Sequence, residues 1–483
     1  MSSNNKHSGF SRRQFLQAAA SAVGATAAPF ALNLAAIGSA AAASSTGNDY
    51  KALVCVFLAG GNDPFNTLLA TDLSSWSEYV RLRTTNDSGS IALPYVGANG
   101  GVLPIAPTTQ QAGRTFALHP AMAQVRDLFN SGNTAIIANV GTLMAPTTKA
   151  QYKAASVPLP AKLFSHNDQQ SMWQAYAPEG ARVGWGGRMA EMVGSGNTDA
   201  TFTAISTAGS AVFLAGRNIT QYQISDAGAV AIRNINGNLF GAKGNANPLK
   251  AIVAGQRSDM FEKEHAAVVS RSINAQITLS SAMAPVGPTG VVNPTLYINP
   301  NTGASSVNPL ALQLQTVARI IAARTNLGAK RQVFYVSLGG FDTHDFQKTA
   351  HADLLAKLAH GMAYFDSVMT NLQGADLRQQ VTLFTASEFG RTFASNGDGT
   401  DHGWGSHHFV MGGAVKGKNI YGKVPVTGVG HELDIGSGAL LPTIAVDQYA
   451  ATLGTWFGLS TTQINDVFPN LGRFDSRNLG FMV

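Results

Sequence analysis

Mostly apolar runs of about seven residues recur along this chain and indicate strands buried on both faces. They lie at residues 52–58, 134–140, 332–338 and 381–386. Stretches with helical spacing lie at residues 122–129, 248–284, 310–323, 350–372 and 445–457, and residues 162–170 and 184–189 each open a further helix. Because strands that alternate with helices pair in parallel through right-handed crossovers, the pattern predicts an α/β fold with a mostly parallel sheet flanked by helices.

The region between residues 197 and 308 breaks this regularity. Residues 197–239 alternate short apolar runs with Gly, Asn and Ser, and residues 286–308 are rich in Pro, Gly and Asn. Such composition favours short strands and exposed connections. We therefore expect one α/β domain over residues 44–483, with an inserted cap region at residues 197–308.

Charge and cysteine content narrow the class of protein. Only 12% of the 483 residues are charged, against about 25% in typical domains. The net charge of +6 includes Lys6, Arg12 and Arg13, with no acid before Asp49, so the chain beyond residue 43 carries 6 − 3 = +3. A charge so small and scattered does not favour binding to nucleic acid. The single cysteine, Cys55, excludes an internal disulfide framework, and its apolar surroundings indicate a buried thiol.

Residues 1–43 have the pattern of a twin-arginine signal peptide. The Arg12-Arg13 pair precedes an Ala-rich, weakly apolar stretch at residues 18–36 and a run of small residues at 39–43 that suits cleavage. The alternative is a membrane anchor, which the Ala and Gly content and the cleavage signal disfavour. We expect the twin-arginine translocase to export the chain to the periplasm or the cell exterior, with no stable membrane span after cleavage.

Three motifs rich in acidic residues and histidine follow one another near the C-terminus. They are Gly-Gly-Phe-Asp-Thr-His-Asp at 339–345, Ser-Glu-Phe-Gly-Arg at 387–391 and Asp-His-Gly-Trp-Gly-Ser-His-His at 401–408. The first two each follow a predicted strand, as does a Gly-Gly-Asn-Asp turn at 60–63. Because ligand groups in open α/β sheets gather beyond the carboxyl ends of the strands, we expect these side chains to meet in one crevice.

These motifs, together with the leader and Phe-Ser-His at 164–166, resemble the bacterial Tat-exported family labelled domain of unknown function 1501. That family is similar to the alkaline phosphatase and sulfatase superfamily. The resemblance implies an alkaline phosphatase-like core and metal-dependent hydrolysis of phosphate or sulfate esters.

The candidate site residues follow one another along this chain in the same order as the site residues of the superfamily. The resemblance implies Ser165 as nucleophile, Arg391 as a clamp for anionic oxygens, and a set of metal ligands: Asp63, Asp342, His344, Glu388, His402 and His407, with His408 as an alternative to the last. Carboxylates neutralise divalent cations and imidazoles add directional nitrogen ligands, whether the ion is zinc, magnesium, calcium or manganese. Glu388-Phe389 stands where the superfamily has an Asp-His pair, and this departure could cost one metal, which would leave a single-ion site or none.

Several of these residues also have purely structural explanations. Ser165, three residues before Asp168, fits a capping box. Asp63 could satisfy the amides of its own turn, and Asp342 or Asp345 could cap the next helix.

For Arg391 and for the adjacent residues His407 and His408, other considerations restrict a role in the site. Arg391 could pair with Glu388 rather than with a substrate. His407 and His408 would face opposite sides of a strand, so at most one of them joins a shared site. His119 and His166 are further candidates.

Two functional classes follow. The first is an exported, metal-dependent hydrolase of small anionic esters, favoured by the density of Asp, Glu and His after strand ends. The second is a catalytically inactive exported protein that keeps the fold and serves binding or assembly in the cell envelope. Phe389 favours this second class.

Overall fold

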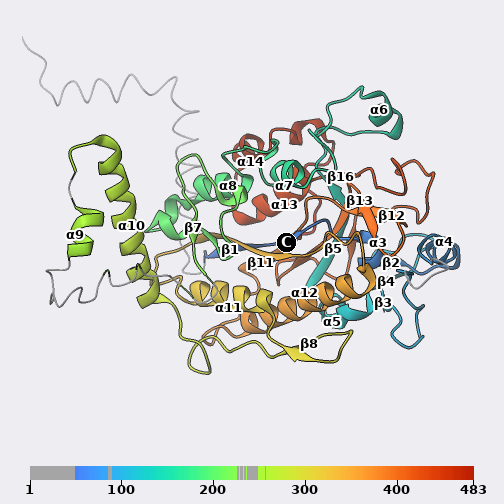
Figure 1. Ribbon diagram of the computed structural model, residues 1–483, viewed down its shortest axis with the longest axis horizontal. Helices are drawn as coiled ribbons and strands as arrows, with labels where there is room; N and C mark the ends of the chain where they lie inside the picture. Colours follow the sequence, from blue (N-terminus) through green and yellow to red (C-terminus); the bar gives the residue numbers. More distant parts are fainter. Residues whose placement is uncertain are drawn as a thin grey trace, which may run out of the picture. The chain divides into compact units, whose positions relative to one another are not determined.

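A mostly parallel, nine-stranded sheet forms the centre of the unit Lys51–Val483 (Figure 1). The computed structural model describes residues 49–84, 90–225, 228, 232, 235, 248–255 and 257–483. The strands are β1 (Lys51–Ala59), β5 (Thr134–Gly141), β6 (Ala204–Ser206), β7 (Tyr222–Gln223), β10 (Arg331–Gly339), β11 (Val381–Ala386), β14 (Ser406–Met411), β15 (Ile420–Tyr421) and β16 (Ile444–Ala445). Their order is β15-β5-β14-β11-β1-β10-β6-β7, with β16 also paired to β5. Within the sheet only β14 runs antiparallel to its neighbours.

Helices cover both faces of this sheet, as Figure 1 shows. One face carries α5 (Ala123–Asn130), α11 (Pro309–Ala322) and α12 (Gln347–Thr370); the other carries α7 (His166–Ala175), α8 (Trp185–Val193), α13 (Val446–Phe457) and α14 (Thr461–Val467). The smaller elements are α3 (Pro64–Thr67), β2 (Leu68–Ala70), α4 (Leu73–Arg83), β3 (Leu103–Ile105), β4 (Phe116–Leu118), α6 (Lys149–Ala154), α9 (Pro248–Ala254), α10 (Met260–Ala282), β8 (Tyr297–Ile298), β9 (Ser305–Ser306), β12 (Arg391–Ser395) and β13 (Thr400–His402). The predicted α/β architecture is confirmed.

Local chemistry explains where the main elements begin and end. The interior of β1 is buried throughout, as expected for a central strand covered on both faces. At the start of α11 the Asn308 side chain accepts from Leu310 N at 3.0 Å, and Pro309 supplies the fixed φ of the first turn. Helix α13 ends at Gly458, whose φ of 114° suits a residue without a Cβ.

The region 197–308 contributes to the central sheet as well as to peripheral structure. Its strand β6 pairs with β10, and β7 pairs with β6. The helical pattern at 248–284 is interrupted: α9 ends at Ala254, and α10 starts at Met260 behind the cap Asp259. A cap function for the rest of this region stays a prediction.

The carboxyl ends of three adjacent parallel strands, β11, β1 and β10, lie side by side. Gly60, after β1, has a φ of 120°, and a Cβ there would lie 2.2 Å from Asp342 N. A Cβ on Gly61 would lie 2.5 Å from the Phe389 ring. Glycine at both positions therefore lets the loops after β10 and β11 close over the end of β1.

Two further sequence predictions concern the strand core and the membrane. Cys55 is a free, buried thiol in β1, as predicted. Over the residues that the structure describes, no helix is both long enough and apolar enough to span a membrane.

Candidate metal centre

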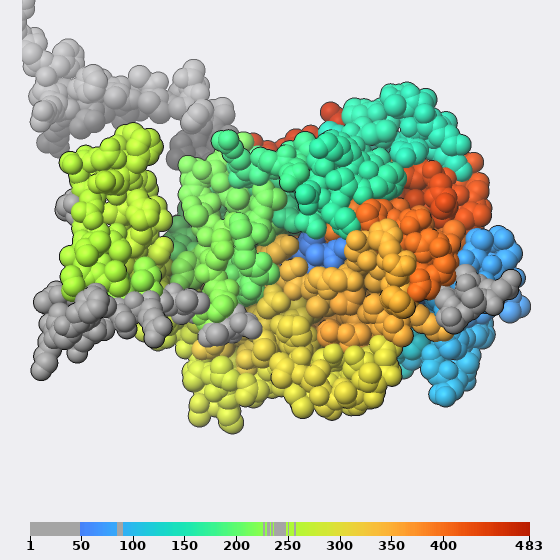
Figure 2. Space-filling view, viewed as in Figure 1, coloured from blue at the N-terminus to red at the C-terminus, as the bar shows by residue number. Residues whose placement is uncertain are grey.

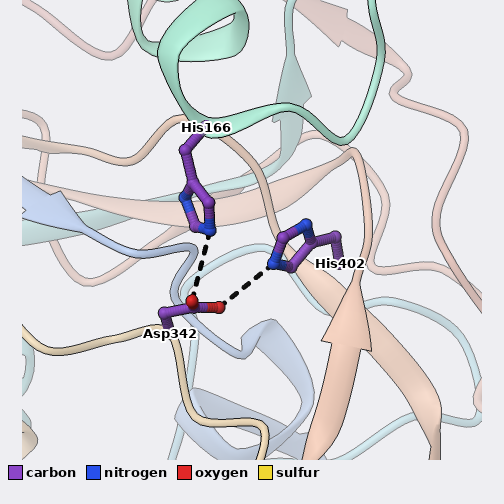
Figure 3. Close-up of side chains that lie close together, drawn as sticks. All are labelled: His166, Asp342 and His402. Atoms are coloured by element: carbon purple, nitrogen blue, oxygen red, sulfur yellow. Dashed lines mark hydrogen bonds and ion pairs between the residues drawn. The ribbon is translucent and has the colours of Figure 1, made fainter.

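Three side chains beyond the strand ends form a cluster that could hold a metal ion (Figure 3). They are His166, Asp342 and His402, and their ligand atoms all lie within 4.8 Å of one another. His166 Nε2 is 3.3 Å from Asp342 Oδ2, and His402 Nε2 is 3.1 Å from Asp342 Oδ1. Among the described residues this is the one such group of three or more His, Cys, Asp or Glu side chains.

Each of the three comes from a different part of the fold. His166 is the first residue of α7, Asp342 follows β10, and His402 ends β13. In the β12–β13 hairpin, His402 pairs with Arg391, so both side chains reach the same carboxylate.

The protonated nitrogen of His166 faces a buried carboxylate. Glu388 Oε1 lies 3.0 Å from His166 Nδ1 and also accepts from Gly60 N at 2.8 Å and Gln170 Nε2 at 3.0 Å. Because this oxygen acts as an acceptor, His166 Nδ1 donates to it and Nε2 is left to face Asp342. The hydrogen bond with Glu388 raises the pKa of His166, which also makes Nε2 a stronger ligand.

His402 is oriented in the same way by a backbone carbonyl. Its Nδ1 lies 2.8 Å from Phe164 O, and a carbonyl oxygen can only accept, so Nδ1 carries the proton. Burial lowers the pKa of His402, which favours the neutral ring with a lone pair on Nε2. Phe164 has a φ of 72°, a left-handed conformation that is costly for a side chain of this size and that aims its carbonyl at the ring.

In these neutral tautomers both Nε2 lone pairs point at the Asp342 carboxylate, whose oxygens are also acceptors. His166 Nε2 is a buried atom with no hydrogen-bond partner among the described residues. His344 Nε2 lies 3.0 Å from His402 Nε2 and can donate one proton there, but no described group donates to His166 Nε2. A divalent cation between the three side chains would satisfy all the lone pairs at once.

Arg391 holds the carboxylate in place. Its guanidinium is fully buried, and Nη1 donates to Asp342 Oδ1 at 2.7 Å and to Gly60 O at 3.1 Å. The other donors reach Thr400. Burial by itself would raise the pKa of Asp342, but the hydrogen bond and the positive charge of Arg391 outweigh it and keep this pKa below its usual value. With these donors engaged, Arg391 positions Asp342; it does not pair with Glu388.

The centre is open to solvent on one side. The side chains of Asp342, His166 and His402 are 43%, 30% and 21% exposed. At the middle of Figure 2 a small blue surface from the segment around β1 lies between the green and orange segments, so this part of the chain is reached from outside. His344, at the rim, lies 3.1 Å from Asp342 Oδ1 and turns Nδ1 toward Asp401.

Phe389 forms an apolar wall of the centre. Its ring centroid lies 4.9 Å from that of His166 and 4.6 Å from that of His402. Phe389, which stands where the superfamily has a histidine ligand, therefore packs against the rings of two candidate ligands.

The structure does not bring Asp63 into this cluster. Its carboxylate is fully buried and accepts from Arg83 Nη1 at 2.5 Å, Gln347 Nε2 at 2.6 Å and Phe65 N at 2.9 Å. These partners leave Asp63 committed to an internal ion pair and to the start of α3.

Ser165 is the N-cap residue of α7, yet its hydroxyl makes no capping hydrogen bond. It donates to Asp168 Oδ2 at 2.9 Å. Asp342 and Asp345 do not cap α12, which begins after Phe346 without a side-chain cap.

The adjacent histidines of β14 both lie away from the cluster. His407 Nδ1 accepts from Asn139 N at 3.0 Å, and burial lowers the pKa of His407 to about 4. His408 packs between Trp173 and Tyr449. Both are core side chains in this structure.

Among the predicted ligands, Asp342 and His402 lie in the cluster and His344 lies at its rim. Glu388 is not a member of the cluster but is hydrogen-bonded to His166. The third member of the cluster is His166, which the sequence analysis named as a further candidate without assigning it as a ligand. The signal available in the sequence was its place at a helix start within the Phe-Ser-His motif, where the serine seemed the more reactive neighbour.

Residues 50–468 match the family described as "Protein of unknown function (DUF1501)". The chain belongs to this family. No curated protein matched the chain.

Solved structures similar to this chain include a Bacteroides thetaiotaomicron protein from a genetic locus for the metabolism of multiple glycosaminoglycans (9% identity, TM-score 0.32, covering 86% of this chain and 74% of the other). They also include Ps i-CgsB in complex with k-i-k-neocarrahexaose (9% identity, TM-score 0.35, covering 89% and 77%) and Ps i-CgsB alone (9% identity, TM-score 0.33, covering 89% and 77%). TM-scores this low support no conclusion about activity.

Proposed function

We propose that this protein is an exported hydrolase of phosphate or sulfate esters that uses one divalent cation held by His166, Asp342 and His402. The observation that carries the proposal is the hydrogen bonding of the two imidazoles. Each ring donates Nδ1–H elsewhere, to Glu388 or to Phe164 O, and turns Nε2 toward one carboxylate. Zinc-binding histidines typically have such an outer partner.

The number of ligands fits catalysis better than a purely structural role. Catalytic zinc sites use three protein ligands and leave a position open, whereas structural sites are closed by four. The partial exposure of Asp342, His166 and His402 leaves room for a substrate. When bound, a divalent cation would neutralise ester oxygens and activate water as the nucleophile.

The remaining residues have supporting roles in this proposal. Glu388 keeps the proton of His166 on Nδ1, and Arg391 fixes the position of Asp342. His344 is close enough to contact a bound ester. Water rather than Ser165 is the nucleophile in this proposal; the Ser165 hydroxyl donates to Asp168.

The test begins with the metal. Protein isolated from its native host is analysed for bound metal and assayed with aryl phosphates, phosphodiesters and aryl sulfates. We expect about one equivalent of metal, turnover of at least one ester class, and loss of both in Asp342→Ala, while Ser165→Ala retains both. Metal-free protein, or metal content unchanged in Asp342→Ala, would rule out this centre.

The second candidate function is that of a protein that binds the metal ion but does not hydrolyse esters. It is favoured by the absence of a serine nucleophile from the cluster and by the position of Phe389, and it would suit a binding or assembly component of the cell envelope. Stoichiometric metal with no turnover of any ester would support it.

Export through the twin-arginine translocase remains part of the proposal. The predicted signal peptide at residues 1–43 lies outside the described residues. Replacing Arg12 and Arg13 by Lys should retain the chain in the cytoplasm, as measured by cell fractionation; unchanged export would contradict this route.

A further inference from the structure

A polar pocket of about 280 Å³ lies next to the candidate metal centre. Four of its lining residues, Asn167, Gln170, Ser171 and Gln174, follow the i, i+3, i+4, i+7 spacing of one face of α7. Ser210 also lines the pocket. The same helix that begins with His166 thus carries the pocket.

Gln170 joins the pocket to the centre. Its Nε2 donates to Glu388 Oε1, the same oxygen that accepts from His166 Nδ1. Gln170 is four residues beyond His166, and one helical turn rises about 5.4 Å. A substrate whose anionic group lies at the centre would therefore extend into the pocket within about one turn of α7.

The hydrogen bonds within the pocket walls leave several acceptors for a ligand, and the amide nitrogens of Asn167 and Gln170 each keep a second N–H. Gln170 Nε2 is used by Glu388, Asn167 Nδ2 points to Glu179 Oε1 at 3.4 Å, and Ser171 Oγ donates to Pro178 O at 2.9 Å. The amide oxygens of Asn167 and Gln170 and the carboxylate of Glu179 can still accept.

The charge of the lining residues also indicates a neutral ligand. None of the lining residues is Lys or Arg, and Glu179 is acidic. Such a pocket disfavours a second anionic group. It favours a neutral ligand with several hydroxyl groups, which can both donate and accept hydrogen bonds.

We propose that this pocket binds the alcohol portion of the ester and that this alcohol is a polyhydroxylated, sugar-like ring. The inference rests on the proposed function, because it places the anionic group of the same substrate at the metal centre. The pocket takes no part in bond making or breaking; it selects the substrate.

The test compares two ligands that share an anionic group. Binding of glucose 6-phosphate and of methyl phosphate to zinc-loaded protein is measured by calorimetry, and the corresponding sulfates are measured in parallel. For one of the two anions we expect the glucose ester to bind about 10-fold more tightly than the methyl ester, as one or two additional hydrogen bonds would give.

Variants then locate the additional affinity. Ser210→Trp, at the exposed rim, should abolish the preference for the glucose ester and leave binding of the methyl ester unchanged. Ser280→Trp, at an exposed site on α10, is the matched control and should change neither. Asn167→Ala, which removes one acceptor, should reduce the preference about threefold even if the tryptophan variant folds poorly.

The outcomes separate the two levels of the proposal. If neither methyl ester binds, the proposed function fails and the pocket assignment fails with it. If a methyl ester binds but the glucose ester binds no more tightly, or keeps its preference in both pocket variants, the pocket assignment alone is overturned.

Discussion

Asp63 offers a sharp test of the difference between a buried ion pair and a metal ligand. Its carboxylate and the Arg83 guanidinium are both 0% exposed, with Nη1 and Oδ2 2.5 Å apart. Burial would raise the pKa of Asp63, but the charge and hydrogen bonds of Arg83 outweigh it and lower that pKa. Asp63→Asn leaves the Arg83 charge buried without a counterion, which costs about 3–5 kcal/mol.

That cost can be converted into a melting temperature. The unit Lys51–Val483 has 483 − 50 = 433 residues. At about 2.1 cal/mol/K per residue its unfolding entropy is about 0.9 kcal/mol/K, so the substitution should lower Tm by about 3–6 °C. Asp376→Asn, in the exposed pair with Arg378, should lower it by less than about 1 °C because exposed pairs contribute little.

Calorimetry in the presence of a chelator gives the Tm, and zinc titration of each folded variant gives metal binding. We expect Asp63→Asn to lose stability but keep the metal, and Asp342→Asn to lose the metal. An Asp63→Asn protein with the parent Tm and no zinc binding would refute the structural role argued here and restore Asp63 as a ligand.

Three further predictions follow from the centre and the core. Glu388→Gln should weaken zinc binding about 10- to 100-fold, because the outer partner of a ligand histidine is altered; unchanged affinity in a zinc titration would count against the arrangement. Gly60→Ala should abolish zinc binding, because its Cβ would lie 2.2 Å from Asp342 N at a φ of 120°; a zinc-binding alanine variant would show that the loop can move aside. Burial raises the pKa of Asp447 to about 7, above an unfolded value of about 3.9, so its contribution to stability is complete below pH ~4 and is lost as pH rises through ~7, by up to roughly 4 kcal/mol. Asp447→Asn should therefore match the parent at pH ~3.5 and unfold at higher urea at pH 8.5, and parallel pH profiles of the two proteins would contradict this.

Most of the fold could be predicted from the sequence because its signals are local. The buried runs that became β1, β5, β10 and β11 are apolar on both faces, a pattern that only a covered sheet satisfies. Short strands were expected in residues 197–239, but the pairing of β6 with the central sheet could not be predicted, since three residues carry too little periodicity.

The site was predicted in part for the same reason. Asp342 and Glu388 could be placed near each other because both follow parallel strands, which is a rule of topology. Their roles could not be separated, because a carboxylate that binds an ion and one that orients a histidine have the same residue type and differ only in their partners.

The sequence by itself determined the class of fold, the family motifs and the edge of the sheet where polar groups gather, since these depend on composition and local pattern. Only the tertiary structure decided which groups meet. Arg83 removes Asp63 from the site, and the carbonyl of Phe164 orients His402. Those choices are made by contacts between segments up to hundreds of residues apart, which no local pattern encodes.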